Sequence, residues 1–576
     1  MLLVNSSLSA VEYWDKAEGD RFISQHGSTV IKTPDIPDAR AELEAEMEAV
    51  KLVMCSLRTR HNALAFVNRL PSEVLAQIFE WVRKAYMDSS PHNSRRVPVA
   101  KADIQWVDLT HVCRQWRIVA INHPVLWSHI FIGTKFTEEF LRRSHGALVT
   151  INYTTDFPAW IVSTPQPDDD VEDLAGIISQ NLSHMQSFGF MATRAHYAII
   201  LPFLLRPAPV LEKAVLTNGF FVSLDTTPAP SLPSDLFDRF APRLRHLQLH
   251  GWSFPWSFHT FNTLVHLQIS RLREPPGTTD TGDLGEFLAA LSRMPSLQVL
   301  VLINVLPTPH LSSSQSTYRP EQVVYLPSLH TLNLSDTIHR CCLTLEHIAA
   351  PPTVEYEIRC TEHDGPNTLL VPWLSANART SPAIRVLHVQ QSDGVQITAF
   401  GNSEELPGIT SRLLFRLILE DPGEGGPSRQ EMENLLDALP LETMEVLHLS
   451  RWASEFPFLD WPGIFCGYPN LQHISVECEP DYDFGETSTI HDLLDIGISP
   501  RVGETPSPPF PSLVVLTLQG FDFGRDRDLY DSFLTWLGRW GPFKVLVLKD
   551  VMVETDLVDR LKALAFDLRV VETAPS

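Results

Sequence analysis

One apolar spacing recurs along most of the chain and limits the folds that the chain can adopt. At each recurrence, large apolar residues occupy positions i, i+3 and i+5, often with a proline two positions before the first of them. Eleven segments have this spacing, and they begin at Leu211, Leu244, Leu264, Leu297, Leu329, Ile384, Leu414, Met444, Leu471, Leu513 and Phe543. Most neighbours lie about 20–33 residues apart, as in repeat proteins, and longer intervals near residues 355 and 495 indicate a degenerate unit and an insertion.

The spacing predicts β-strands, because side chains alternate between the two faces of a strand and positions i+3 and i+5 share one face. Helical patterns precede several of these segments, with Asp283 as a cap and with Ser428 and Glu431 as a capping box. One such unit cannot bury its own apolar face, so the units are expected to stack into a parallel sheet with helices outside. The predicted fold class is α/β: a small N-terminal helical motif, then an irregular solenoid over residues 140–576 whose strands resemble leucine-rich repeats. A mixed α/β enzyme fold is the competing interpretation and explains the spacing poorly.

The chain before the repeats has three parts. Residues 1–33 show no clear period and are expected to be poorly ordered. Residues 34–66 are expected to form an amphipathic helix with a stripe at i, i+4, i+7, i+11 and i+14, made by Leu43, Met47, Val50, Met54 and Leu57. Its N-terminal half is acidic and its C-terminal half basic, which suits the helix dipole. The stripe is a candidate coiled-coil seam, but packing on the following domain is the preferred interpretation.

Two further amphipathic segments follow, separated by a polar stretch at residues 86–101 that is expected to be a loop. LPSEVLAQIFEWV, residues 70–82, predicts a helix with Pro71 at its start and Ser72 as a cap. WVDLTHVCRQWRIVAINHPVLW predicts a second helix that ends at Pro124. Helices this short cannot cover both apolar faces, so the rest of this chain or another protein must cover them.

These two segments resemble an F-box, particularly the loop-extended kind found in fungal proteins. The resemblance lies in the Leu-Pro opening, the Val-Cys-Arg-x-Trp-Arg sequence and the closing Leu-Trp, and it predicts an F-box-like domain at residues 67–132 with an inserted loop at 86–101. It implies a three-helix motif that docks on the Skp adaptor of a cullin-RING ubiquitin ligase. The residues that it places in the adaptor contact or directly behind it are Leu70, Pro71, Val74, Leu75, Ile78, Phe79, Leu109, Val112, Cys113 and Trp116.

Charge and cysteine content restrict the partners and the compartment. The net charge is −24, and residues 1–150 hold 18 basic and 17 acidic residues, so the acidity lies in the remainder. An acidic surface repels phosphates, which argues against nucleic acid as a partner and suits basic partners or simple solubility. No apolar run is long enough to span a bilayer, so no membrane partner is expected. Seven cysteines without framework spacing favour a reducing compartment, hence the cytoplasm or the nucleus.

The strand alternation also predicts which side chains point away from the core. At positions i+2 and i+4 the predicted strands carry a polar, nearly uncharged series that is rich in histidine. Solenoids commonly bind partners through this face, and a solvated strand face is the simpler interpretation. The candidate target-binding residues are His246, Gln248, His266, Gln268, His388, His448 and His473.

No catalytic constellation stands out in the sequence. Phosphate-binding, dinucleotide-binding, nucleophile-elbow and His-Glu-x-x-His motifs are missing, and neither a metal site nor a cofactor is expected. The hypothesis is therefore a substrate-recognition subunit of an SCF-type ubiquitin ligase that binds an unknown protein target, and not an enzyme itself. A leucine-rich-repeat interaction scaffold without a ligase role is the alternative, and a hydrolase-like enzyme is a third possibility.

Overall fold

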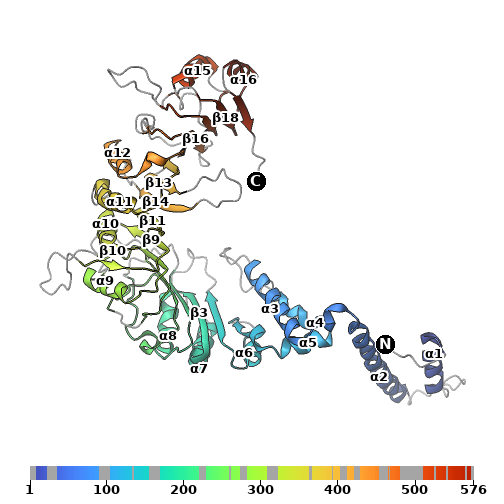
Figure 1. Cartoon of the computed structure of the whole chain (residues 1–576). Coiled ribbons are helices and arrows are strands. Elements are labelled where there is room, and N and C mark those ends of the chain that lie inside the picture. Colours follow the sequence, from blue (N-terminus) through green and yellow to red (C-terminus); the bar gives the residue numbers. More distant parts are fainter. Residues whose placement is uncertain are drawn as a thin grey trace, which may run out of the picture. The chain divides into compact units, whose positions relative to one another are not determined.

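The computed structural model divides the chain into two compact units, which are residues 1–95 with 99–126, and residues 96–98 with 127–576. The second unit thus begins before the predicted boundary at residue 140, because strand pairing already starts at His129. Figure 1 shows the elements of both units. The structure describes residues 8–22, 36–89, 104–132, 135–154, 169–219, 229–257, 261–272, 282–307, 322–361, 366–391, 394–401, 412–420, 429–452, 465, 468–479, 494, 510–524, 527–539, 543–564 and 567–571.

The first unit is helical throughout its described residues. Its elements are α1 (Ala10–Arg21), α2 (Ile36–Asn62), η3 (Phe66–Arg69), α3 (Ser72–Ser89), η4 (Gln105–Asp108), α4 (Leu109–Val112), α5 (Arg114–Ile121) and η5 (Pro124–Trp127). Helix α1 lies where the sequence predicted poor order. A capping box starts it, in which Glu12 N–H donates to Ser9 Oγ and Ser9 N–H donates to a Glu12 oxygen. Residues 1–7 and 23–33 lie outside the described residues.

Helix α2 confirms the predicted amphipathic helix, but its apolar stripe packs on nothing within the described residues. No residue of α2 is buried, and Leu43, Met47, Val50, Met54 and Leu57 are all exposed. The expectation that this stripe packs on the following domain is therefore wrong. The described link from α2 to α1 is an ion pair between Glu46 and Arg21.

The predicted loop at 86–101 begins too early. Helix α3 continues to Ser89, because no proline or glycine interrupts residues 72–89 and the first proline after them is Pro91. The remainder of the predicted loop lies outside the described residues. The helix starts after Pro71, whose carbonyl accepts from Leu75 N–H at 3.1 Å.

The second unit is an α/β structure whose described strands form one large sheet of 17 strands and a separate sheet of two, made by strands β8 and β10. Its strands are β1 (His129–Ile130), β2 (Val149–Thr154), β3 (Met185–Ala192), β4 (Lys213–Asn218), β5 (His246–His250), β6 (His266–Ser270), β7 (Val299–Ile303), β8 (Val324–Tyr325), β9 (Thr331–Asp336), β10 (Ile348–Ala349), β11 (Glu355–Cys360), β12 (Val386–Gln391), β13 (Gly394–Phe400), β14 (Leu413–Glu420), β15 (Val446–Trp452), β16 (His473–Glu479), β17 (Val515–Gln519), β18 (Val545–Lys549) and β19 (Asp567–Val571). Its helices are α6 (Thr137–Ser144), α7 (Asp169–Asn181), η6 (Leu182–His184), α8 (Arg194–Leu204), η7 (Leu236–Arg239), α9 (Leu284–Ser292), α10 (Ile338–His347), η8 (Asn367–Leu370), α11 (Val371–Ala378), α12 (Arg429–Asp437), η9 (Leu441–Thr443), η10 (Arg527–Leu529), α15 (Tyr530–Arg539) and α16 (Thr555–Lys562).

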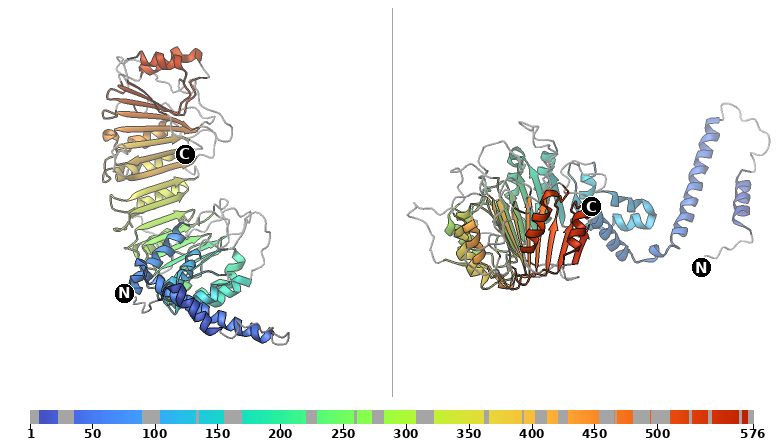
Figure 2. Two further views of the ribbon diagram at one scale, coloured as in Figure 1. Left: turned by 90° about the vertical axis from the view of Figure 1, so that its right-hand side faces the viewer. Right: turned by 90° about the horizontal axis from the view of Figure 1, so that it is seen from above.

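Every one of the eleven predicted strand segments is a strand of this sheet, and its i, i+3 and i+5 residues are buried. Figure 2 shows the strands stacked one after another, and in Figure 1 helices α8 to α12 line one face of the sheet. The predicted α/β class with a mostly parallel sheet is therefore confirmed. We call the sheet face opposite these helices the open face; it carries the i+2 and i+4 side chains.

The sheet departs from a simple parallel stack at one place. Strands β1 to β7, β9 and β11 pair in chain order and in parallel, and so do β15 to β19. Between these runs, β14 pairs with β11, and β12 pairs with β15, while β13 lies antiparallel between β14 and β12. Among the described strands, this one antiparallel strand is the exception to the predicted parallel sheet. The hairpin partners β12 and β13 are joined too closely for the crossover that parallel pairing needs.

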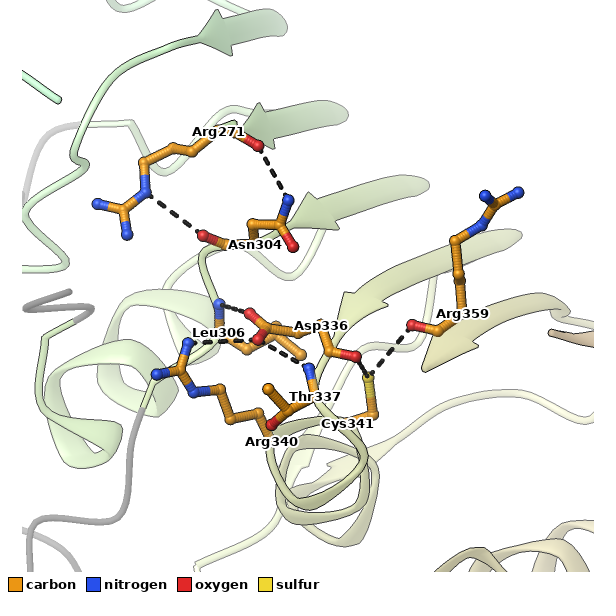
Figure 3. Close-up of polar contacts among 8 residues, drawn as sticks. All are labelled: Arg271, Asn304, Leu306, Asp336, Thr337, Arg340, Cys341 and Arg359. Atoms are coloured by element: carbon orange, nitrogen blue, oxygen red, sulfur yellow. Dashed lines mark hydrogen bonds and ion pairs between the residues drawn. The ribbon is translucent and has the colours of Figure 1, made fainter. Parts of the chain in front are cut away.

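Polar side chains join the ends of neighbouring strands (Figure 3). At the end of β9 the buried carboxylate of Asp336 accepts from Leu306 N–H at 3.1 Å, from Thr337 N–H at 2.9 Å and from Arg340 Nη1 at 3.2 Å. Burial raises the pKa of Asp336, and Arg340 opposes that shift. After β7, Asn304 Nδ2 donates to the Arg271 carbonyl at 3.1 Å. These bonds hold successive strands in one register without the help of a hairpin turn.

Candidate functional site

The F-box-like segment has a small apolar core. Leu75 and Phe79 of α3 are buried there with Trp106, Ala120 and Leu126. The Phe79 and Trp116 rings lie 5.0 Å apart between centroids, which joins α3 to α5. Two of the predicted adaptor residues, Leu75 and Phe79, thus form the core behind a surface and not the surface itself.

An apolar surface remains on the other side of α3. Pro71 is exposed, and Val74, Ile78 and Trp81 follow it at a spacing of four and three residues, which places them on one helix face. All three are exposed, and the Trp81 side chain has 72% of its surface open to solvent. Trp81 was missed in the sequence although it continues the period that starts at Val74. We call Pro71, Val74, Ile78 and Trp81 the α3 face.

The predicted second helix is two helices. Cys113 has an extended backbone with φ −157° and ψ 170°, which ends α4 and starts α5. Its Sγ accepts from Trp116 N–H at 3.5 Å and so takes the place of a capping oxygen, while Arg117 Nε donates to the Thr110 carbonyl at 2.8 Å. The break leaves Val112 exposed over 57% of its surface, while Leu109, Cys113 and Trp116 are half-buried.

Asn68 connects the approach to α3 with α5, and nothing in the sequence pattern pointed to it. Its Oδ1 accepts from Trp116 Nε1 at 2.6 Å, and its Nδ2 donates to the Asn62 carbonyl at 2.7 Å. Its own carbonyl accepts from Gln115 Nε2 at 3.0 Å. Asn68 therefore positions the half-buried Leu70 and the start of the α3 face relative to α5.

The candidate target residues all lie on the open face, but in two separate groups. In the first group His246 and Gln248 of β5 stand directly opposite His266 and Gln268 of β6. The His246 and His266 rings are 5.9 Å apart between centroids, and Gln248 Nε2 lies 3.3 Å from His266 Nε2. Burial and the neighbouring His246 lower the pKa of His266.

The second group joins β12, β15 and β16. The ring centroids of His388 and His448 are 4.3 Å apart, and those of His448 and His473 are 5.9 Å apart. Burial, and after it the two adjacent imidazoles, lower the pKa of His448 to about 3, so this ring is neutral at physiological pH. His473 Nε2 lies 2.9 Å from Thr517 Oγ1. The neutral imidazole of His448 offers both a hydrogen-bond donor and an acceptor.

Charged residues lie between the two groups, where the sequence predicted a nearly uncharged face. On β11 and β14, Arg359 Nη1 pairs with Glu420 at 2.9 Å, and Arg416 Nη1 pairs with Glu357 at 3.7 Å. Arg416 is the i+2 residue of the segment that begins at Leu414 and was overlooked, whereas Glu357 and Arg359 belong to the degenerate unit near residue 355, which the i+2 and i+4 series does not include. The open face thus has a charged segment between its two histidine groups.

Two kinds of feature are missing from the described part of the chain. No group of three His, Cys, Asp or Glu side chains lies close enough together to hold a metal ion. None of the helices there has the length and apolar character required to cross a bilayer.

Comparison with known proteins gives one result for the N-terminal part of the chain. No curated protein matches the sequence. The family model described as F-box-like matches residues 67–133, which agrees with the predicted domain at 67–132. The chain therefore contains an F-box-like domain that spans α3, α4 and α5.

Proposed function

We propose that the chain is a substrate-recognition subunit of an SCF-type cullin-RING ubiquitin ligase. In this proposal the F-box-like domain docks on the Skp adaptor, the adaptor links it to the cullin, and the repeat-containing second unit binds a protein target. F-box domains generally bind adaptors of this kind. The protein would then contribute no catalytic group of its own; it would hold the target near an enzyme of the assembly, where proximity raises the rate.

The observation that carries the proposal is the α3 face. Val74, Ile78 and Trp81 form an exposed apolar strip on a helix that buries Leu75 and Phe79 in the domain core. Leaving such a strip in contact with water is unfavourable by roughly 25 cal/mol per Å² of apolar surface. A partner that covers the strip gains this free energy on docking. Aromatic anchors such as Trp81 commonly dominate the binding energy of a protein interface.

The open face supports the target-binding half of the proposal. Its two histidine groups lie on strands that are paired in register, and most of their side chains are half-buried, so they form a pre-organised surface. The strand pattern resembles leucine-rich repeats, and solenoids of that kind bind partners along the sheet. The acidity of the chain beyond residue 150 suits a target with basic residues.

Binding of purified Skp adaptor to the full-length chain tests the proposal. Val74→Asp with Ile78→Asp places two carboxylates on the α3 face without touching the buried Leu75 and Phe79. We expect the adaptor affinity to fall by roughly tenfold or more, because charge replaces desolvated apolar contact. Isothermal titration calorimetry measures the affinity, and circular dichroism checks that the helices are retained.

A matched control variant is Val323→Asp with Tyr325→Asp, which adds two carboxylates at exposed apolar positions of the second unit. This control should bind the adaptor as the native chain does. If the native chain does not bind the adaptor, or if the α3-face variant binds it unchanged, the ligase proposal fails. The interaction scaffold without a ligase role then becomes the better interpretation.

A further inference from the structure

Helix α2 has the features of a self-association surface. It is 27 residues long, or about 40 Å at 1.5 Å per residue, and no residue of it is buried. Its apolar stripe alternates steps of four and three residues, which is the spacing of a coiled-coil seam. Val50, in the middle of this seam, has 60% of its surface exposed.

The charges beside the seam specify the partner. The N-terminal half of α2 carries Glu42, Glu44, Glu46 and Glu48, and the C-terminal half carries Lys51, Arg58 and Arg60. A second α2 that runs parallel would place acidic half beside acidic half and basic half beside basic half. A second α2 that runs antiparallel would place each acidic half beside a basic half, which is attractive at both ends. The helix is therefore complementary to a reversed copy of itself.

The heptad positions give one register for this pair. When Met47 faces Leu57 of the second copy, Val50 faces Met54 of that copy. The twofold axis then generates the same two contacts a second time, with the copies exchanged. In that register Glu44 lies beside Arg58 of the other copy and Glu46 beside Arg60, so two-fold symmetry produces four ion pairs. Among the described residues, Arg58 and Arg60 take part in no ion pair within their own chain, whereas Glu44 and Glu46 would exchange their present partners, Arg40 and Arg21.

We propose that the protein forms a homodimer through an antiparallel pair of α2 helices. The dimer does not depend on ligase function. If the ligase proposal also holds, one assembly would carry two F-box-like domains and two target-binding sheets.

Sedimentation equilibrium of the purified full-length chain tests the dimer in the absence of adaptor. We expect a concentration-dependent species of twice the chain mass of 64.9 kDa. Val50→Asp with Met54→Asp buries carboxylates in the seam and should raise the dimer dissociation constant at least tenfold. Leu52→Asp, at an exposed position of α2 outside the seam, should leave the dissociation constant unchanged. Circular dichroism separates loss of the dimer from loss of the helix.

Charge exchange tests the antiparallel orientation. Glu44→Lys with Glu46→Lys should weaken the homodimer, and so should Arg58→Glu with Arg60→Glu. Mixing the two variants should restore a dimer, because the four pairs that positions 44 and 46 make with positions 58 and 60 are then all attractive. A native chain that stays monomeric at all concentrations overturns the proposal, because no second copy would then cover the seam. Dimerisation that persists in the Val50→Asp, Met54→Asp variant overturns the proposal as well. If mixing the two charge variants does not restore the dimer, the antiparallel register is refuted.

Discussion

A buried carboxylate at the end of β9 joins three segments of the second unit. Asp336 is only 3% exposed and accepts hydrogen bonds from the segment after β7, from its own strand end and from α10. The Arg340 guanidinium that pairs with it is itself mostly buried. Removing one partner of such a pair leaves a buried charge without compensation, which costs more than the pair contributes.

The first prediction at this scale is that Asp336→Ala lowers the free energy of unfolding by about 2–4 kcal/mol. Urea unfolding followed by circular dichroism measures the change. The matched control is Asp531→Ala. The Asp531 side chain is 84% exposed and pairs with Arg560, so this substitution removes an exposed ion pair. That exposed pair should contribute at most about 1 kcal/mol. Equal effects of the two substitutions would contradict the importance given to burial at Asp336.

Single residues also show the limit of sequence reasoning. The apolar pattern of residues 70–82 identified the right helix, but it could not separate the buried Leu75 and Phe79 from the exposed Val74 and Ile78. The apolar face was wider than the core available to cover it, and only packing decides which edge is covered. Asn68 has no signal at all, because its role depends on residues 47 and 48 positions away.

Among the elements, the reordered strands β12, β13 and β14 depend on a close approach at Gly394. A Cβ atom at this position would lie 2.1 Å from the Leu419 carbonyl oxygen and 2.9 Å from Glu420 Cα. Both are backbone atoms, so β13 could accept a side chain there only by moving away from β14.

We therefore predict that Gly394→Ala destabilises the second unit by about 2 kcal/mol or more. Gly538 in α15 supplies the control, since an added Cβ there meets no atom within 4 Å. Gly538→Ala should be neutral or slightly stabilising, because alanine favours the helix. Thermal unfolding of the two variants beside the native chain measures the difference. A Gly394→Ala chain as stable as the native one would show that the β13 edge is not tightly paired.

The predicted elements are confirmed where the apolar residues follow the two-residue alternation of a strand. All eleven i, i+3, i+5 segments are strands, since alternation with buried leucines leaves no other arrangement. Strand direction carries no such signal, so the antiparallel β13 was not foreseen. The break between α4 and α5 at Cys113 was missed because the apolar residues on both sides of it follow one helical period. The extended backbone of Cys113 depends on capping and tertiary contacts.

For the whole molecule, the sequence predicted the class of fold and the order of the two parts. The boundary at residue 140 was placed too late, because β1 and β2 lack the leucine spacing that identified the other strands. The charge distribution agrees with the two proposed binding roles. Residues 1–150, which include the apolar α3 face, have almost no net charge, and the acidic residues are in excess in the part with the open face.

The open face also makes the stability of the second unit depend on pH. Burial lowers the pKa values of His250, His266 and His448, the last to about 3 from an ordinary value of 6.5. Between these two values the folded chain binds fewer protons at His448 than the unfolded chain does. The contribution of His448 to stability is therefore complete above about pH 6.5 and decreases as the pH falls toward 3.

Replacing His448 by glutamine should make the protein less sensitive to acid. Each pH unit below 6.5 should cost the native chain about 1.4 kcal/mol through this one imidazole, and His448→Gln should remove that part of the slope. Urea unfolding at pH 7.5, 6.5 and 5.5 measures the slope for both chains. His330→Gln is the matched control, because it replaces a histidine that is exposed to solvent and so leaves the half-buried imidazoles of the open face in place. Identical slopes for the native chain and His448→Gln would mean that His448 takes up its proton in the folded state, and that the three-histidine row of β12, β15 and β16 opens to water as the pH falls.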